Sequence, residues 1–573
     1  MSSIKCGGVG CQSTPVFCPG HLSNPLQTKQ EVDTGGTGTD VEKQQSLNTV
    51  APSSGNAHTI RKGIGWWLVI VGLCLITVMY EVDNATLHIY RNYALSEFQQ
   101  LSKLATLMTT STIISAVAKP PIAKLSNVIG RGQTYLLTIC LYILSYILMA
   151  SAHGLGTYTA GAVLYSLGQS GTGVMNAIIV ADITTAKWRA FGFGLSFWPF
   201  LITPWTAGFI VENVTAQTGI GWRWGIGMMA ILMPFCGSFI VTTLWYYQGK
   251  AKRQSPALTT TTISMYEFCS QVDLGGIVFF AGGFGSLLLP LTLATTTPGS
   301  WATPWIIACV AVGVVFLTIL PIYEHCLAKH PLVPPRYFKH QTIGLCMMLT
   351  LCDGLSHGAT HTYAYAWATT ALGLNSRDAT FYTYTSSVAQ TIVAIVSGLA
   401  MAKTKRYKWL CVVGSAIQLV GYGVMLRLRG AENSMTEIYL QQVIQGLGAG
   451  TLSASLLVPC QVVVSHAEMP QVTSLFLSFA FLGGSIGACI AGGIYTNALE
   501  PALWKYLGDE ATPENVAALA NSMTGTLATW GSTERTAISF AFTAVMRYIT
   551  YAAIGTAAIA FIGSTFMTNY ELP

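Results

Sequence analysis

Residues 64–84 read IGWWLVIVGLCLITVMYEVDN, an apolar block about as long as a helix needs to cross the hydrocarbon core of a bilayer. Similar blocks recur along the 573-residue chain, and its mean hydropathy is +0.50. Charged residues make up 9% of the sequence, against about 25% in soluble globular proteins. The sequence therefore predicts an all-α polytopic membrane protein and excludes a soluble, disordered or collagenous chain.

The apolar blocks predict fourteen transmembrane helices, arranged as two six-helix bundles with two inserted helices between them. The predicted spans are 64–84, 104–124, 135–152, 158–181, 191–211, 224–247, 274–293, 303–323, 343–369, 379–401, 409–427, 438–464, 472–496 and 540–566. The expected regions are a disordered cytoplasmic tail at 1–60, an N-terminal bundle at 61–248, a linker with two extra helices at 249–342, and a C-terminal bundle at 343–573 that includes a long outside loop at 498–535.

The net charge of +6 does not indicate nucleic-acid binding, because the basic residues lie in short loops and not on one soluble face. Lys and Arg are concentrated in the loops of one side, so the positive-inside rule puts both termini in the cytoplasm. We expect a monomeric, multi-pass protein in the lipid bilayer of the plasma membrane or of an endosomal or vesicular compartment.

Cysteine usage and signature motifs point away from enzymatic chemistry. Most of the 14 cysteines lie inside apolar blocks, where a lone Cys behaves as a small hydrophobe. Cys6, Cys11, Cys18 and His21 match no standard zinc spacing. The sequence contains no ATP-binding Gly-x-x-x-x-Gly-Lys loop and no His-Glu-x-x-His zinc signature. We therefore expect no enzyme activity, no cofactor and no bound metal.

Two short basic segments, 123–132 and 402–408, follow the second predicted span of each half and indicate duplicated halves, which are typical of alternating-access carriers. The first resembles the loop motif Gly-x-Leu-Ala-Asp-x-x-Gly-Arg of the major facilitator superfamily, with Asn127 in place of the usual Asp. That replacement puts a charged latch in doubt. Gly130 and Arg131 fit a tight turn that presents a guanidinium to a helix end or a carboxylate.

A closer resemblance rests on four stretches of the first half. They are Tyr80-x-x-Asp83-x-x-Thr86-x-x-x-Tyr90, Lys119-Pro120-Pro121, Ala181-Asp182-Ile183-Thr184 and Trp222-Arg223-Trp224-Gly225. Together they resemble the fungal siderophore-iron transporter family. The resemblance implies import of ferric hydroxamate siderophores in symport with protons, with iron chelate and protons as partners. Members of that family also move haem or exchange glutathione, so a haem importer and a proton-coupled exporter or exchanger of drugs or glutathione stay open as alternatives.

Carboxylates and imidazoles inside the predicted helices are the candidates for proton coupling, because such groups are costly in a membrane and usually face a cavity or a partner. Asp353, His357 and His361 follow one another at steps of four along one helical face. The alternatives are a His pair that bonds neighbouring helices, or one that binds a metal or haem iron. Asp83 is the fourth candidate, and its alternative is that it ends the first span in water.

Aromatic and amide side chains suit a bulky and mostly neutral iron chelate, since rings cover its apolar periphery and amides bond its carbonyls. The candidate substrate-binding residues are Tyr80, Thr86, Tyr90, Tyr165, Gln169, Asn176, Trp198, Tyr365, Tyr384, Gln390, Gln445 and, by resemblance in the outside loop, Trp504 and Tyr506. The alternative for each polar one is a bond between helices.

Gating at the cytoplasmic side is assigned to Gly130, Arg131, Asp182 and Arg189. We expect Asp182 to pair with Arg189 or Lys124, since all three charges fall on one side. Lys119, just before two prolines, is expected to reach the cytoplasmic interface with its long side chain.

Overall fold

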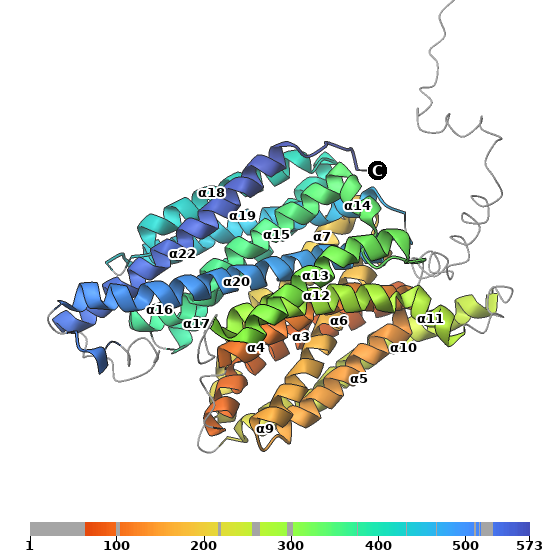
Figure 1. Ribbon diagram of the computed structural model, residues 1–573. Helices are drawn as coiled ribbons and strands as arrows, with labels where there is room; N and C mark the ends of the chain where they lie inside the picture. Colours follow the sequence, from red (N-terminus) through yellow and green to blue (C-terminus); the bar gives the residue numbers. More distant parts are fainter. Residues whose placement is uncertain are drawn as a thin grey trace, which may run out of the picture. The chain divides into compact units, whose positions relative to one another are not determined.

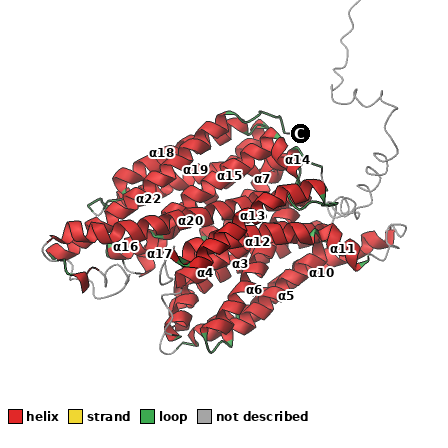
Figure 2. Ribbon diagram, viewed as in Figure 1, coloured by secondary structure: helices red, strands yellow, loops and turns green. Residues whose placement is uncertain are grey.

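The computed structural model describes residues 64–98, 104–215, 219–254, 264–294, 302–374, 376–430, 432–465, 467–508, 511–514, 516 and 531–572. These residues form helices and short connections, and none of them is in a strand (Figure 2). The expected tail at 1–60, with its Cys and His residues, and most of the outside loop lie outside the described residues.

The helices follow the chain as two successive groups joined by an insertion (Figure 1). The first group is α3 (Ile64–Glu97), α4 (Leu104–Val128), α5 (Arg131–Ala150), α6 (Leu155–Ile183), α7 (Ala186–Ser196), the 3-10 helix η2 (Trp198–Leu201), α8 (Thr203–Thr215), α9 (Gly221–Gly227) and α10 (Met229–Gln254). The insertion is α11 (Met265–Val272), α12 (Leu274–Leu293), α13 (Pro304–Cys326) and α14 (Pro335–Lys339). The second group is α15 (Gln341–Thr362), α16 (Ala364–Thr370), α17 (Ser376–Thr404), α18 (Lys408–Leu428), α19 (Met435–Val462), α20 (Met469–Leu507) and α22 (Thr533–Thr565).

Ten of the described helical segments are long and apolar enough to cross a membrane. Three more helices, α4, α6 and α15, have 25, 29 and 22 residues and are long enough, but they carry more polar side chains. The predicted fifth span is broken into α7, η2 and α8, with Pro199 and Pro204 at the breaks, because proline lacks the N–H that continues a helix. The architecture agrees with the predicted all-α membrane fold, and the count of fourteen stays a prediction.

Two helices run more than ten residues further than predicted. Helix α3 continues to Glu97 instead of ending at residue 84, and α20 continues to Leu507 instead of 496. Leu499, Leu503 and Leu507 are buried at steps of four, so the extension of α20 is amphipathic and packs its apolar side inward. Trp504 and Tyr506 therefore lie on a helix and not in an outside loop, which corrects the predicted boundary of that loop.

Close helix approaches in the second group depend on small residues. A Cβ atom at Gly483 would lie 2.2 Å from the Leu351 carbonyl oxygen, and one at Gly354 would lie 2.2 Å from that of Ala480. Backbones of α15 and α20 therefore touch directly, as is typical of membrane helices with small residues at the contact.

The two groups meet chiefly along two helix pairs, α4 with α20 and α7 with α17. We call the end of the bundle where α4, α6 and α17 end the basic end, because the residues there include Lys124, Arg131, Lys187 and Lys403. Near this end a Cβ at Gly398 would lie 2.6 Å from the Phe191 Cα, so α7 and α17 are in backbone contact. Helix α12 packs on both α4 and α20, so the insertion lies beside one of these contacts (Figure 1).

Candidate functional site

Asp83 is buried inside the first helix group. It is 1% exposed, and its Oδ2 accepts a hydrogen bond of 2.7 Å from the Tyr165 hydroxyl. The rings of Tyr142 and Tyr146 lie 5.5 and 6.0 Å from that of Tyr165. The Arg91 guanidinium lies 5.5 Å from the same ring. The alternative that Asp83 ends the span in water is wrong, because α3 continues for fourteen residues beyond it.

Glu81 is a second buried carboxylate that the sequence analysis missed. It is 6% exposed and hydrogen bonds with the side chain of Asn84. The Oδ1 of Asn84 in turn accepts a 3.0 Å bond from Gln169 Nε2 on α6. Tyr384 of α17, in the other helix group, lies close enough to Glu81 to interact with it electrostatically. The sequence alone could have indicated Glu81 as a candidate, since it is a carboxylate inside the first apolar block, two residues before Asp83.

Asp353 lies in α15, and its partner is on another helix. Its Oδ1 accepts a hydrogen bond from Gln418 Nε2 of α18, and Gln418 is 1% exposed. Tyr422, one turn further along α18, is fully buried and accepts a 3.2 Å bond from Gln445 Nε2 of α19. Gln418 and Tyr422 were not among the predicted site residues, because an isolated Gln or Tyr in an apolar block does not reveal its neighbours.

His357 and His361 lie face to face. Their ring centroids are 4.1 Å apart with an interplanar angle of 23°. The Nε2 of His361 lies 3.4 Å from Ser386 Oγ on α17, and the Gln445 side chain also bonds to His361. The structure thus connects the His pair to Tyr422 through Gln445, while the bond of Asp353 goes to Gln418.

The predicted substrate residues fall into three groups. Five are fully buried or nearly so in contacts between or along helices: Thr86, Tyr90, Tyr165, Asn176 and Gln445. For example, Thr86 Oγ1 donates to the carbonyl of Val82 at 2.8 Å, and Asn176 Oδ1 accepts from Tyr135 at 2.6 Å. In this conformation these side chains are engaged in packing, as the alternative reading proposed.

Five others are half-buried, namely Tyr80, Gln169, Trp198, Tyr384 and Gln390. They come from both helix groups, on α3, α6, η2 and α17. The remaining three, Tyr365, Trp504 and Tyr506, are 42%, 40% and 40% exposed. These three lie on α16 and at the end of α20, at the end of the bundle opposite the basic end.

Three of the predicted gating residues, Gly130, Arg131 and Asp182, lie together at the basic end, where Arg131 and Asp182 form a contact that we call the latch. Gly130 has φ of 102°, a backbone conformation that favours glycine, and it caps the start of α5. Arg131 Nε lies 3.3 Å from Asp182 Oδ2, and its Nη1 donates to Ser126 Oγ at 2.9 Å and Asn127 Oδ1 at 2.7 Å. The charge missing at Asn127 is therefore supplied by Asp182 from α6.

The expected pairing of Asp182 with Lys124 was wrong. Asp182 pairs with Arg131, whereas Lys124 donates to the carbonyls of His330 and Pro331 in the insertion. Arg189 is 8% exposed near the start of α7. The expectation for Lys119 was also wrong, since this side chain is 4% exposed and does not reach the interface.

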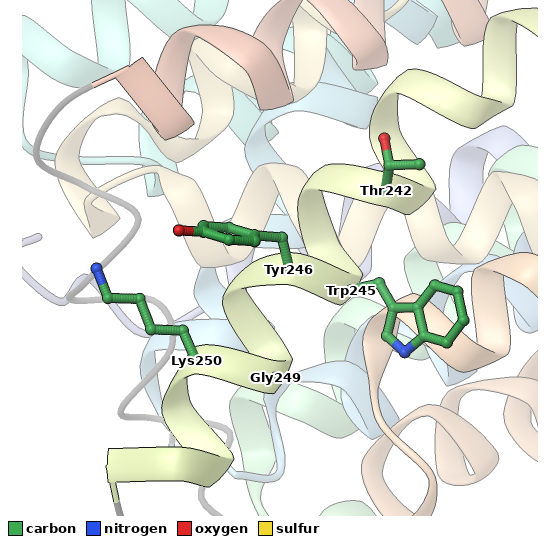
Figure 3. Close-up of a pocket in the computed structure, with 5 residues that line it drawn as sticks. All are labelled: Thr242, Trp245, Tyr246, Gly249 and Lys250. Carbon is green, nitrogen blue, oxygen red and sulfur yellow. The ribbon is translucent and has the colours of Figure 1, made fainter.

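A surface hollow of about 530 Å³ lies on α10, lined by Thr242, Trp245, Tyr246, Gly249 and Lys250 (Figure 3). Trp245 and Tyr246 are 58% and 66% exposed, as expected on a membrane-facing helix. None of the coupling or substrate candidates lines it, so it is separate from the central polar residues. Among the described residues no group of three or more His, Cys, Asp or Glu is arranged to hold a metal ion.

Comparison with known proteins agrees with this architecture. The crystal structure of a peptide transporter, POT, in complex with sulfate matches with a TM-score of 0.52 and 15% identity, over 91% of this chain and 97% of that chain. At this level of identity the match shows that the two chains share a fold. No protein-family profile matches the chain.

Two curated relatives from Schizosaccharomyces pombe narrow the class. "Siderophore iron transporter 1" is 30% identical over 84% of this chain and 78% of its own length. "Low affinity heme transporter str3" is 28% identical over 74% of this chain and 69% of its own length. The chain belongs to the fungal siderophore iron transporter family, as the sequence resemblance indicated.

Proposed function

We propose that this protein imports ferric siderophore chelates of the hydroxamate type by proton symport and alternating access. The observation that carries the proposal is the pair of carboxylate networks, one in each helix group: the buried Asp83 with Tyr165, and the half-buried Asp353 with the buried Gln418. A relative named as a siderophore iron transporter supports the substrate class.

Proton coupling follows from the chemistry of these networks. A carboxylate buried in a membrane helix without a cation at ion-pair distance is expected to change its protonation state when its surroundings change. Asp353 is held by an amide and not by an ion pair, and the His pair lies one and two turns further along the same helix. Asp353, His357, His361 and Asp83 are therefore the proposed coupling groups, and Glu81 joins them.

The substrate contacts are assigned to the five half-buried side chains, which come from both helix groups. Tyr80, Trp198 and Tyr384 offer aromatic faces, and Gln169 and Gln390 offer amides. A ferric trihydroxamate is largely neutral and covered with carbonyl oxygens and apolar linkers, so it needs rings and amides more than charges.

Alternating access is supported by the contacts at the basic end. The helix groups are in backbone contact there through α7 and α17, so this conformation is closed toward the basic end. With both termini in the cytoplasm, that end faces the cytoplasm and the substrate enters from the other side. The residence is the plasma membrane or an endosomal membrane.

Haem import is the second candidate. One relative is named as a haem transporter, and the stacked pair His357 and His361 provides imidazoles of the kind that bind haem iron. Replacement of both His by Gln distinguishes the candidates by binding and not by uptake, because the pair is also proposed to couple protons. The change removes iron-binding nitrogens, so haem binding should fall, but it leaves the rings and amides, so siderophore binding should persist.

The test is uptake of radioactive iron by iron-starved cells with and without the protein, presented as several ferric hydroxamates and as haem at two external pH values. Uptake of one hydroxamate that rises at acid pH is the expected result. Haem binding to the purified protein that is lost in the His double variant, while siderophore binding persists, supports the second candidate. Failure to accumulate any chelate, in cells where the protein reaches the surface, argues for export or exchange.

A further inference from the structure

Lys119 places a buried ammonium in the contact between the two helix groups. The side chain is 4% exposed, and its Nζ donates to the Ser115 carbonyl at 3.2 Å and to Ser170 Oγ at 3.3 Å. Nζ also lies 3.7 Å from the centroid of the Phe481 ring. No carboxylate among the described residues lies within ion-pair distance of Lys119. The ring is therefore part of what compensates the charge.

Phe481 belongs to α20, in the other helix group. It is 38% exposed, so the ring separates the ammonium from open space. Three residues earlier, Ser478 Oγ donates across the same contact to the Ala116 carbonyl at 2.7 Å. Two polar interactions thus tie α4 to α20, and both must break when these helices separate.

The position of Lys119 places this contact between the central polar residues and the basic end. Ser170, which accepts from Lys119, directly follows Gln169, which bonds to Asn84 near Glu81. Lys119 lies nine residues before the end of α4, which is about 14 Å along the helix from the basic end. A substrate that leaves the centre toward the basic end has to pass this level.

We propose that Lys119 and Phe481 form a substrate-operated gate toward the basic end, in which oxygen atoms of the iron chelate replace the Phe481 ring as the partner of the ammonium. The inference rests on the proposed function for the identity of the chelate. Burying an ammonium without a nearby anion costs free energy of desolvation, and attraction to the face of an aromatic ring offsets part of it. An oxygen-rich chelate beside Lys119 offers stronger acceptors than the ring and so favours opening.

If this gate exists, substitutions of Phe481 and of Lys119 should have opposite effects on the closed state. Phe481→Leu keeps an apolar contact but removes the π face, so the ammonium loses compensation and the closed state weakens. Lys119→Met keeps a long side chain and its apolar contact with the ring but removes the charge, so the closed state should become more stable. A gate that worked by packing alone would weaken in both variants.

The experiment follows opening with a reporter cysteine at Ala190, a 1% exposed residue of α7 that lies in the contact between α7 and α17 at the basic end. The rate of reaction of Ala190→Cys with a water-soluble maleimide is measured in open membrane fragments, without added ligand. The same protein without the reporter corrects for native cysteines. Phe479→Leu is the matched control, because Phe479 lies on the same helix but its ring contacts Phe338 of the insertion.

Without ligand, Phe481→Leu should speed labelling roughly tenfold, the size of a lost desolvated cation–π contact, while Phe479→Leu leaves the rate unchanged. Lys119→Met should slow labelling, and Lys119→Arg should stay near the parent rate. In the double variant Lys119→Met with Phe481→Leu, the loss of the ring should have little effect, because there is no charge to compensate. If Phe481→Leu speeds labelling equally with and without the Lys119 charge, or no more than Phe479→Leu does, the gate is refuted.

A second arm adds a ferric trihydroxamate as the probe. The chelate should speed labelling of the parent and not of Lys119→Met. If the ligand-free variants label as expected but the chelate does not change the labelling rate of the parent, the chelate does not operate the gate. The uptake experiment then shows whether this chelate is transported at all. If the chelate is taken up and the ligand-free variants all behave like the parent, the transport proposal stands and the gate fails.

Discussion

The Tyr165 hydroxyl donates a 2.7 Å hydrogen bond to the Asp83 carboxylate, and it does so from α6 to α3 in the interior of the first helix group. The bond joins two of the predicted site residues that the sequence placed 82 positions apart. It assigns Tyr165 the role of a partner for the carboxylate, in addition to any contact with substrate.

Tyr165→Phe should lower the stability of the purified protein by about 1–3 kcal/mol, because it leaves a buried carboxylate short of a hydrogen bond. The matched control is Tyr142→Phe, whose ring stacks in the same cluster but whose hydroxyl has no hydrogen-bond partner among the described residues. Thermal unfolding in detergent measures both. Equal melting temperatures for the two variants would show that the Asp83 bond contributes nothing to stability.

Asp353→Asn should abolish the rise of uptake at acid pH while leaving the protein at normal levels in the membrane. The amide of Asn keeps a hydrogen bond with Gln418 but cannot take up or release a proton. Asp378→Asn is the control, since Asp378 lies in an exposed ion pair with Arg377. Initial uptake rates over a range of external pH decide the matter, and an unchanged pH profile in Asp353→Asn would exclude this residue from coupling.

Asp182→Asn should loosen the latch at the basic end. Arg131 would keep its bonds to Ser126 and Asn127 but lose its ion pair, whose side chains are only 14% and 18% exposed. A loss of about 1.5–3 kcal/mol is expected for a hydrogen bond to a charged group. The exchange variant Asp182→Arg with Arg131→Asp should recover part of the stability. Failure of Asp182→Asn to change either melting temperature or uptake rate would remove the latch from the transport cycle.

Glu97 provides a pH-dependent contact at the opposite end. Its carboxylate accepts bonds from Arg223 Nη2 at 2.7 Å and Trp222 Nε1 at 2.6 Å, and the bond from Arg223 is the main reason that its pKa lies below the ordinary value of 4.5. A lowered pKa in the folded state means that this stabilisation is complete above pH 4.5 and is lost as the pH falls through the folded pKa.

Glu97→Gln should therefore reduce the fall in melting temperature between neutral pH and the region below pH 4.5, with a small amplitude because the Glu97 side chain is 50% exposed. Glu432→Gln, a change at an exposed residue, is the control. A melting curve of Glu97→Gln that falls as steeply with acid as that of the parent would contradict the assignment.

Local sequence predicted the positions of most helices. Apolar blocks of bilayer length predicted where helices occur, and each predicted span coincides with one helix or with adjoining pieces of one. The ends were harder, as α3 and α20 show, because a helix that leaves the apolar region continues as long as one of its faces stays buried. The Gly130 and Arg131 turn was also predictable, since only glycine readily adopts its positive φ.

The partners of the functional side chains were decided by tertiary structure. The composition and periodicity of the sequence determined a helical membrane protein, and they nominated Asp83, Asp353, His357 and His361, because the cost of polar groups in a bilayer acts on each residue by itself. Which group meets Asp182, and whether Lys119 reaches water or a ring from the other half, depends on helices that are distant in sequence. A side chain's neighbours across a helix contact leave no local pattern in the chain, and so only the packed structure could assign them.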